Sequence, residues 1–219
     1  VGAFEMPYHT YADDSYTAEA CGGHVWGADA FATIQAAVNA VGPAGTVDVA
    51  AGTFNETVTL TRAVNLLGAQ AGVDPRGGAR TAGSASESII HGQGTRTDAL
   101  FIQGAGDAAR VTGVVVDGFE VANAQDVNVR FDYADGCVLK NTIVHGSTSN
   151  EGIKTRASCA SLLFQTVLSY GNKGDGIQLG GYGTHVNHQI EDSEFYNNDD
   201  RGIFFDSISN CTLLRSKAY

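Results

Sequence analysis

Five side chains in this sequence have types and spacing suited to chemistry: two basic residues, Lys154 and Arg156, a third, Arg130, and two proton carriers, Tyr182 and His185. Lys154 and Arg156 are two positions apart, so in an extended strand they point to the same side. Removing a proton next to a carboxylate requires a base and a cation that neutralises the carboxylate. Lys154 or Arg156 could be that base in its uncharged form, with Tyr182 or His185 as the acid. The set would suit proton abstraction from a uronic acid.

Acidic residues come shortly before these basic ones, in segments that read as turns: Glu151, Asp175 and Asp199. Ca²⁺ takes six to eight oxygen ligands, and carboxylates are common among them. The three acids are therefore a candidate Ca²⁺ site, provided that the fold stacks the turns on one another.

Arg130, Gln178 and Asp206 are candidate ligand-binding residues, because a repeat in the sequence places them on the same outward side as Lys154 and Arg156. A second interpretation of all these charges stays open. One exposed sheet face can carry ordinary solvated acids and bases that screen one another.

The elements that must position these residues repeat with a period of about 25 residues from about residue 110 onward. One column of the repeat holds an aromatic residue or a histidine: His145, Tyr170, Tyr196 and Tyr219. A second column is aliphatic and is expected to point inward: Val127, Ile153, Ile177 and Ile203, with Leu179 and Phe205 beside it. A period in the twenties, rich in β-branched residues and glycine, is typical of a β-solenoid.

Stacked coils also predict two ladders. Ser147, Asn172 and Asn198 share a turn column, where side-chain amides can hydrogen-bond along the solenoid axis. The tyrosine column predicts an aromatic stack, and a platform for sugar is the alternative.

The N-terminal part has a different period. Residues 1–28 are expected to be irregular, apart from one strand within Phe4–Tyr11 and a turn at Asp13. Apolar residues in the segment DAFATIQAAVNAVGP then follow a helical spacing, so a helix is expected over about 30–41, with Asp29 as its N-cap. Such a helix would cap the open end of a solenoid that occupies residues 29–219. The segment VDPRGGARTAGSASE has no period and predicts a loop that walls a groove.

Composition excludes several classes of function. The formal net charge of −11 argues against a nucleic-acid partner, which requires the opposite sign. No apolar run reaches the roughly 18 residues of a membrane span. The four cysteines, Cys21, Cys137, Cys159 and Cys211, show no CxxC spacing, so they are either buried thiols or, for Cys137 and Cys159, a disulfide pair. Asn55 and Asn210 begin glycosylation sequons.

The runs FATIQAAVNAV, GTVDVAAGTFNETVTL and AVNLLGAQAG, followed by repeated xGIxx coils, resemble right-handed parallel β-helix proteins of the pectin-lyase-like superfamily. The resemblance covers nearly all of the chain after residue 28. It implies an all-β fold, a single-stranded right-handed parallel β-helix with an N-terminal capping helix. It also implies a secreted or cell-surface protein whose partner is a polysaccharide or cell-surface glycan.

The resemblance carries over no set of catalytic residues. The QAVALR-like and YQDTL-like motifs of pectin methylesterases and the RxPxxR-like segment of pectate lyases are absent, and Lys154 with Arg156 matches the Lys and Arg of chondroitinase-B-like alginate lyases only in part. The leading expectation is therefore a surface scaffold that engages carbohydrate or self-assembles. The alternative is a lyase or epimerase acting on an acidic, uronate-containing polysaccharide.

The sequence stops in mid-coil at Tyr219. An open coil leaves unpaired backbone groups above an apolar core. The stretch from Cys211 to Tyr219 is accordingly expected to contact further chain, either its own continuation, a second copy or a partner strand.

Overall fold

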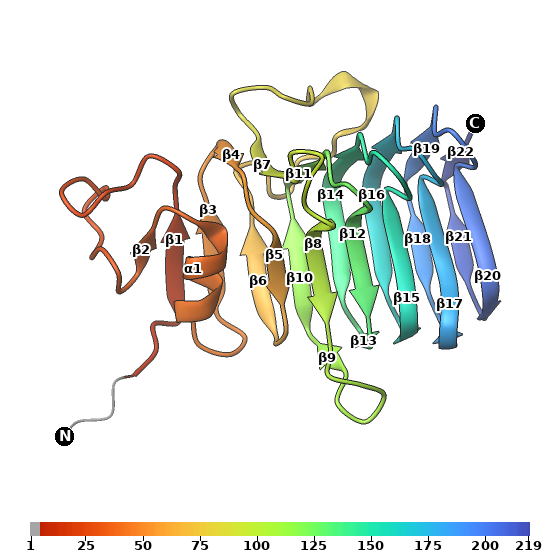
Figure 1. The fold of residues 1–219 in the computed structure, drawn as a ribbon, viewed down its shortest axis with the longest axis horizontal. Coiled ribbons are helices and arrows are strands. Elements are labelled where there is room, and N and C mark those ends of the chain that lie inside the picture. Colours follow the sequence, from red (N-terminus) through yellow and green to blue (C-terminus); the bar gives the residue numbers. More distant parts are fainter. Residues whose placement is uncertain (1–4) are drawn as a thin grey trace.

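The computed structural model describes residues 5–219 and shows a parallel β-helix, whose strands stack coil upon coil along one axis (Figure 1). Each full coil contributes strands to three faces, named A, B and C. Every pairing between the named strands is parallel, as repeats that advance by one coil require. The predicted all-β solenoid is confirmed.

Faces A and B are continuous through two long strands, β14 (Val138–His145) and β16 (Leu163–Tyr170), and together form a 14-stranded sheet. The remaining strands of face A are β1 (His9–Ala12), β2 (Ala30–Phe31), β3 (Thr46–Val49), β6 (Val64–Leu67), β10 (Val114–Asp117), β18 (Gln189–Glu191) and β21 (Thr212–Leu214). Those of face B are β4 (Gly52–Phe54), β7 (Ser88–His91), β11 (Phe119–Ala122), β19 (Glu194–Tyr196) and β22 (Lys217–Ala218).

Face C is a separate 8-stranded sheet, and it carries most of the residues singled out from the sequence. Its main strands are β5 (Val58–Leu60), β8 (Asp98–Gln103), β12 (Val127–Asp132), β15 (Ile153–Ala160), β17 (Ile177–Val186) and β20 (Ile203–Ser209). Two short strands, β9 (Val111–Thr112) and β13 (Ala134–Asp135), extend it beside β15.

The inner side of face C is the predicted aliphatic column. Ile153, Ile177 and Ile203 are in register, and the first two are fully buried, as is Leu179. Phe205 was expected inside but is 41% exposed, because β20 is the edge strand of face C and no further strand of that sheet covers it.

The register at β12 differs from the expectation by two residues. Ile153 pairs with Val129, where Val127 was expected. The neighbouring Asn128, expected to point outward, is fully buried and donates hydrogen bonds to the carbonyl of His145 and to Asn172 Oδ1. A shift of two leaves the alternation of inward and outward residues unchanged, so the sequence pattern could not reveal it.

Both predicted ladders are present. Asn172 Nδ2 donates to Asn198 Oδ1 at 2.9 Å, and its own Oδ1 accepts from Asn128 and from the backbone N–H of Ser147. The aromatic column on face B is a continuous stack, with ring centroids 5.4, 5.0 and 5.6 Å apart from His145 through Tyr170 and Tyr196 to Tyr219.

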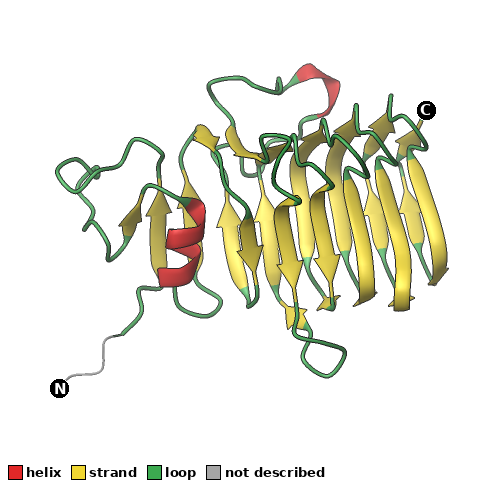
Figure 2. Cartoon of the chain, viewed as in Figure 1, coloured by secondary structure: helices red, strands yellow, loops and turns green. Residues whose placement is uncertain are grey.

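The helix α1 covers Ile34–Ala40, shorter than the expected 30–41 (Figure 2). Its N-cap is Thr33, whose hydroxyl accepts from Ala36 N; Asp29 instead accepts from the backbone of Val25. Ile34, together with Ala37 and Val38, is buried where α1 contacts β1, β3 and β5.

Part of the segment expected to be irregular joins the sheet. β1, at His9–Ala12, pairs in parallel with β3, while Phe4, where the expected strand began, lies outside the described residues. The turn at Asp13 is present, with Tyr16 N donating to its carbonyl at 3.0 Å. No helix among residues 5–219 has both the length and the apolar character that a membrane crossing demands.

A long loop over residues 68–87, with the short 3-10 helix η1 (Arg76–Gly78), lies on the outside of face B (Figure 1). Arg80 fixes it there. The guanidinium is buried, pairs with the two carboxylate oxygens of Glu87, and donates to the carbonyls of Phe119 and Asn141. The predicted loop is therefore a packed part of the fold.

All four cysteines are free in the structure. Cys137 and Cys159 are buried, and burial raises the pKa of the Cys159 thiol to about 12, so it stays protonated. The buried-thiol interpretation is confirmed for Cys137 and Cys159, which form no disulfide, whereas Cys21 and Cys211 are only partly buried.

Candidate functional site

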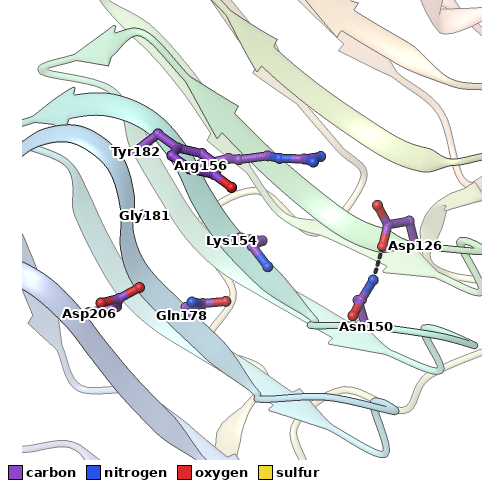
Figure 3. Close-up of a pocket in the computed structure, with 8 residues that line it drawn as sticks. All are labelled: Asp126, Asn150, Lys154, Arg156, Gln178, Gly181, Tyr182 and Asp206. Atoms are coloured by element: carbon purple, nitrogen blue, oxygen red, sulfur yellow. Dashed lines mark hydrogen bonds between the residues drawn. The ribbon is translucent and has the colours of Figure 1, made fainter.

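The outer side of face C is hollowed over strands β15, β17 and β20 and the turns before β12 and β15 (Figure 3). The hollow, called the face C hollow below, has a volume of about 390 Å³. It is lined by Asp126, Asn150, Lys154, Arg156, Gln178, Gly181, Tyr182 and Asp206. Five of the predicted site residues therefore meet in one place: Lys154, Arg156, Gln178, Tyr182 and Asp206.

Strand register explains why they meet. Arg130, Lys154 and Gln178 are paired in successive coils, and Gly180 pairs with Asp206. Because parallel coils stack with a spacing of about 4.8 Å, residues that share an outward column become neighbours without any special loop.

The two basic residues of the hollow differ in their environment. Lys154 Nζ donates to Glu151 Oε1 at 2.8 Å, which makes an ion pair at the edge of the hollow. Arg156 is exposed and forms no ion pair within residues 5–219. Its guanidinium is thus free to bind an anionic ligand, and guanidinium groups bind carboxylates in a bidentate manner.

A glycine-rich bulge in β17 presents Tyr182. The register with β20 shifts between Gly180 and His185, so extra residues of β17 protrude. Gly180 has φ +120°, and a Cβ there would lie 1.7 Å from the carbonyl oxygen of Asp206, so only glycine fits. Tyr182, at the top of the bulge, is 79% exposed. Bulges of this kind often aim a side chain into a functional site.

His185 does not belong to the hollow. His185 lies eight residues after the inward Ile177 and three after the outward Tyr182, so it faces the interior. It is 2% exposed and points Nε2 at the carbonyl of Tyr182 at 3.2 Å. Burial lowers the pKa of His185 and lowers that of the neighbouring His188 to about 4. The expected role of His185 as an acid acting on a ligand in the hollow does not fit this position.

The three acids proposed for Ca²⁺ are not brought together. Each carboxylate pairs with its own base: Glu151 with Lys154, Asp175 with Arg201, and Asp199 with Lys173. Across the described part of the chain, no group of three or more His, Cys, Asp or Glu side chains is arranged to hold a metal ion. The turns are stacked, but the three carboxylates point to different basic residues and do not converge on one point.

Arg130 lies in the column beside Lys154 but does not line the hollow. Its guanidinium pairs with Asp98 and Asp132 and packs over the ring of Phe101, with 4.5 Å to the centroid. These contacts occupy its donors, so Arg130 supports the sheet surface next to the hollow.

Three residues of the hollow were missed by sequence reasoning: Gly181, in the bulge, and two residues in turns. Asp126 and Asn150 occupy the turns before β12 and β15 and hydrogen-bond to each other across one coil. Asn150 directly precedes Glu151, so the alignment of the turn columns contained the signal that would have found it.

Comparison with solved structures supports the fold. Pectate lyase Pel9A matches with a TM-score of 0.66 at 14% identity, over 93% of this chain and 52% of the lyase. A putative glycosyl hydrolase from Parabacteroides merdae matches with a TM-score of 0.55 at 8% identity, over 79% of this chain and 82% of its own length. The A-module of the mannuronan C-5 epimerase AlgE4 from Azotobacter vinelandii matches with a TM-score of 0.50 at 18% identity, over 78% of this chain and 54% of the module.

This chain spans about half the length of the pectate lyase and of the epimerase module. No protein-family model matches the sequence, and no curated protein is significantly similar to it. At these identities the likeness concerns architecture and leaves individual residues unassigned. In architecture, the chain is a parallel β-helix.

Proposed function

We propose that this protein binds an acidic polysaccharide in the face C hollow and serves as a carbohydrate-engaging scaffold outside the cell. The observation that carries the proposal is the exposed Arg156 guanidinium, unpaired within residues 5–219, in the same hollow as Lys154. On a chain of net charge −11, an exposed guanidinium without a carboxylate partner would select both a polyanionic ligand and its position. Two of the similar structures are named for pectate and mannuronan, both polyanions.

The remaining lining residues suit a sugar. Gln178 offers an amide donor and acceptor, Asp206 accepts from hydroxyl groups, and Tyr182 supplies an exposed aromatic ring and a phenol group. Sites of a few hundred cubic ångströms with a few convergent polar groups are typical of small-ligand recognition.

Calorimetric titration with polygalacturonate and alginate, against neutral dextran, tests the proposal. Arg156→Ala should weaken binding of both polyanions about tenfold, the value of one charge-assisted hydrogen bond. Arg215→Ala is the matched control, because Arg215 is an exposed arginine paired with Asp192, far from the lining of the hollow. Equal affinity of the wild type, Arg156→Ala and Arg215→Ala would refute the site.

The bulge favours a second candidate, a lyase acting on the same class of polymer. In β-elimination a base takes the proton from C5 of a uronate, a C4–C5 double bond forms, and the C4–oxygen bond breaks as the leaving oxygen gains a proton. Tyr182 would exchange these protons, while Arg156 and Lys154 neutralise the carboxylate. Lys154 is less suited to the role of base, because it already donates to Glu151.

Ultraviolet absorbance distinguishes the two candidates. A lyase incubated with polygalacturonate, alginate or chondroitin, with or without Ca²⁺, yields unsaturated products that absorb, and Tyr182→Phe should abolish the signal. Binding of polyanion with a flat trace for all three substrates would support the scaffold alone.

We further propose that α1 protects the N-terminal end of the solenoid. Its buried face, including Ile34 and Val38, contacts strands β1, β3 and β5 at the start of the stack. Replacing Val38 by Asp should expose that end and promote association of the chain, which light scattering would detect.

A further inference from the structure

A second hollow lies between the loop over residues 68–87, called the Arg80 loop below, and the tyrosine stack of face B. It has no role in the function proposed above. It has a volume of about 280 Å³. Its lining combines loop residues with outward residues of β14, β16, β19 and the last residue of the chain: Pro75, Gly77, Gly78, Arg80, Thr81, Ala82, Ile143, Leu168, Tyr170, Glu194, Tyr196 and Tyr219. It is called the face B hollow below.

The floor of the face B hollow is apolar although it lies on the outside of the solenoid. Ile143 and Leu168 are paired in successive coils and point outward, beside the tyrosine column. Ile143 is 1% exposed, and Leu168 is half-buried. A patch of this size can pack against the C–H face of a sugar ring, as apolar walls do in small-ligand sites.

The Arg80 loop forms one wall of the face B hollow, and hydrogen bonds to the sheet hold this wall in place without a ligand. Arg80 is tied to Glu87 and to two carbonyls of the sheet, and Gly83 N donates to the buried Glu120 carboxylate at 2.6 Å. Glu120 Oε1 in turn contacts His145 Nε2 at 2.8 Å, which links the wall to the start of the aromatic stack. A preformed wall lowers the ordering cost of binding.

The tyrosines contribute free hydroxyl groups. The ring of Tyr170 stacks between His145 and Tyr196, and that of Tyr196 stacks between Tyr170 and Tyr219, so the faces of both rings are occupied and their edges are left for a ligand. None of the three phenol oxygens has a hydrogen-bond partner within residues 5–219. Burial raises the pKa of Tyr170 and Tyr196, so both phenols remain neutral and can donate as well as accept.

The charges of the face B hollow exclude an anionic ligand. The cation in its lining, Arg80, is fully engaged by Glu87 and the two carbonyls. The one side-chain carboxylate in the lining, Glu194, is contacted by Lys217 at Oε1, at 3.1 Å, so its second oxygen remains available as an acceptor. A uronate would find no free counter-ion here, whereas hydroxyl groups would find both donors and acceptors.

We propose that the face B hollow is a second carbohydrate site, selective for a neutral sugar residue that packs on Leu168 and hydrogen-bonds to the phenols of Tyr170 and Tyr196. The two hollows would then bind glycans of different charge, an anionic one on face C and a neutral one on face B. This inference is independent of the acidic-polysaccharide site, because the two linings share no residue.

Titration of the 219-residue chain with neutral hexasaccharides of glucose, mannose and xylose, followed by calorimetry and saturation-transfer NMR, tests the second site. The wild type should bind at least one of them. Tyr196→Phe removes a single hydroxyl and keeps the stack, so it should weaken binding about five- to tenfold. The double variant Tyr170→Phe/Tyr196→Phe should lose more, with an unchanged melting temperature.

Arg156→Ala is the control that separates the two sites. It should leave the neutral hexasaccharides bound as in the wild type, even if it abolishes binding of polygalacturonate. Failure of all three hexasaccharides to bind, or binding that is lost with Arg156→Ala and retained in the double tyrosine variant, would overturn the second site. The acidic-polysaccharide proposal would survive the first result.

Discussion

The inner and outer sides of face C carry alternating residues of the same strands, but they differ in how much their composition changes from coil to coil. The inner column is aliphatic throughout: Leu100, Val129, Ile153, Ile177 and Ile203. The outer column changes type at almost every step: Phe101, Arg130, Lys154, Gln178 and Phe204. Close packing restricts the volume and polarity of the inner side chains. The outer side chains are less restricted, because hydrogen bonds between the backbones already hold the strands together. The residues of the outer column can therefore form a ligand site with little loss of folding stability.

Ile177→Ala should have the largest effect on stability, because it removes a fully buried side chain with a paired residue on either side. Lost burial and the cavity together should cost about 2–5 kcal/mol. Urea unfolding would measure the loss as a lower midpoint with an unchanged slope. A cost below about 1 kcal/mol, the average for point variants, would mean that the interior is as permissive as the surface.

Acid should destabilise the fold through His188, which lies inside the corner between faces C and A. Its folded pKa of about 4 is below the unfolded value near 6.5, so the unfolded state binds more protons between these pH values. The free energy of unfolding is therefore unaffected by His188 above pH 6.5. It decreases as the pH falls toward 4, by about 3 kcal/mol in all at 1.4 kcal/mol per pKa unit. The lowered pKa of His185 acts in the same direction.

His188→Leu isolates this effect, because Leu162 occupies the matching corner position one coil earlier. The free energy of unfolding of this variant, measured at pH 7 and at pH 4.5, should change less with pH than that of the wild type. An identical pH dependence in both proteins would show that other groups cause the acid sensitivity.

Gln178→Ala should have the smallest effect, although it directly follows Ile177 in the chain. The side chain is half-buried and makes no hydrogen bond within residues 5–219, so the free energy of unfolding should change by no more than about 0.5 kcal/mol. Affinity for polygalacturonate should fall at the same time, because Gln178 lines the face C hollow. A large loss of stability would contradict the division between the two sides of face C.

The repeated half of the chain could be predicted from sequence because identical environments recur in every coil. Ile153 and Ile177 pair as expected, and the tyrosine stack and the asparagine ladder follow from the same period. The register of Val127 was wrong by two residues because a period-2 pattern cannot detect such a shift.

The site could be predicted only in part. Lys154 and Arg156 were found because they stand on one regular strand. His185 was misplaced because it was grouped with Tyr182, although the two are three residues apart on β17 and so face opposite sides of the sheet. The pairing of Glu151 with Lys154 depends on side-chain conformations that no spacing encodes. The glycines around Tyr182 were the available signal for the bulge.

The Arg80 loop also bears on how the chain unfolds. The Arg80 guanidinium donates to the carbonyl of Phe119 in one coil and to that of Asn141 in the next. The loop therefore adds a cross-link between these two coils to the contacts that join their strands directly. Solenoids unfold by fraying where coupling between repeats is weakest. These hydrogen bonds of the Arg80 loop do not reach the strands from β17 onward. The amides of those strands should therefore exchange with solvent before those of β7, β11 and β14. The strands from β17 to β22 would thus unfold while the coils under the loop remain folded.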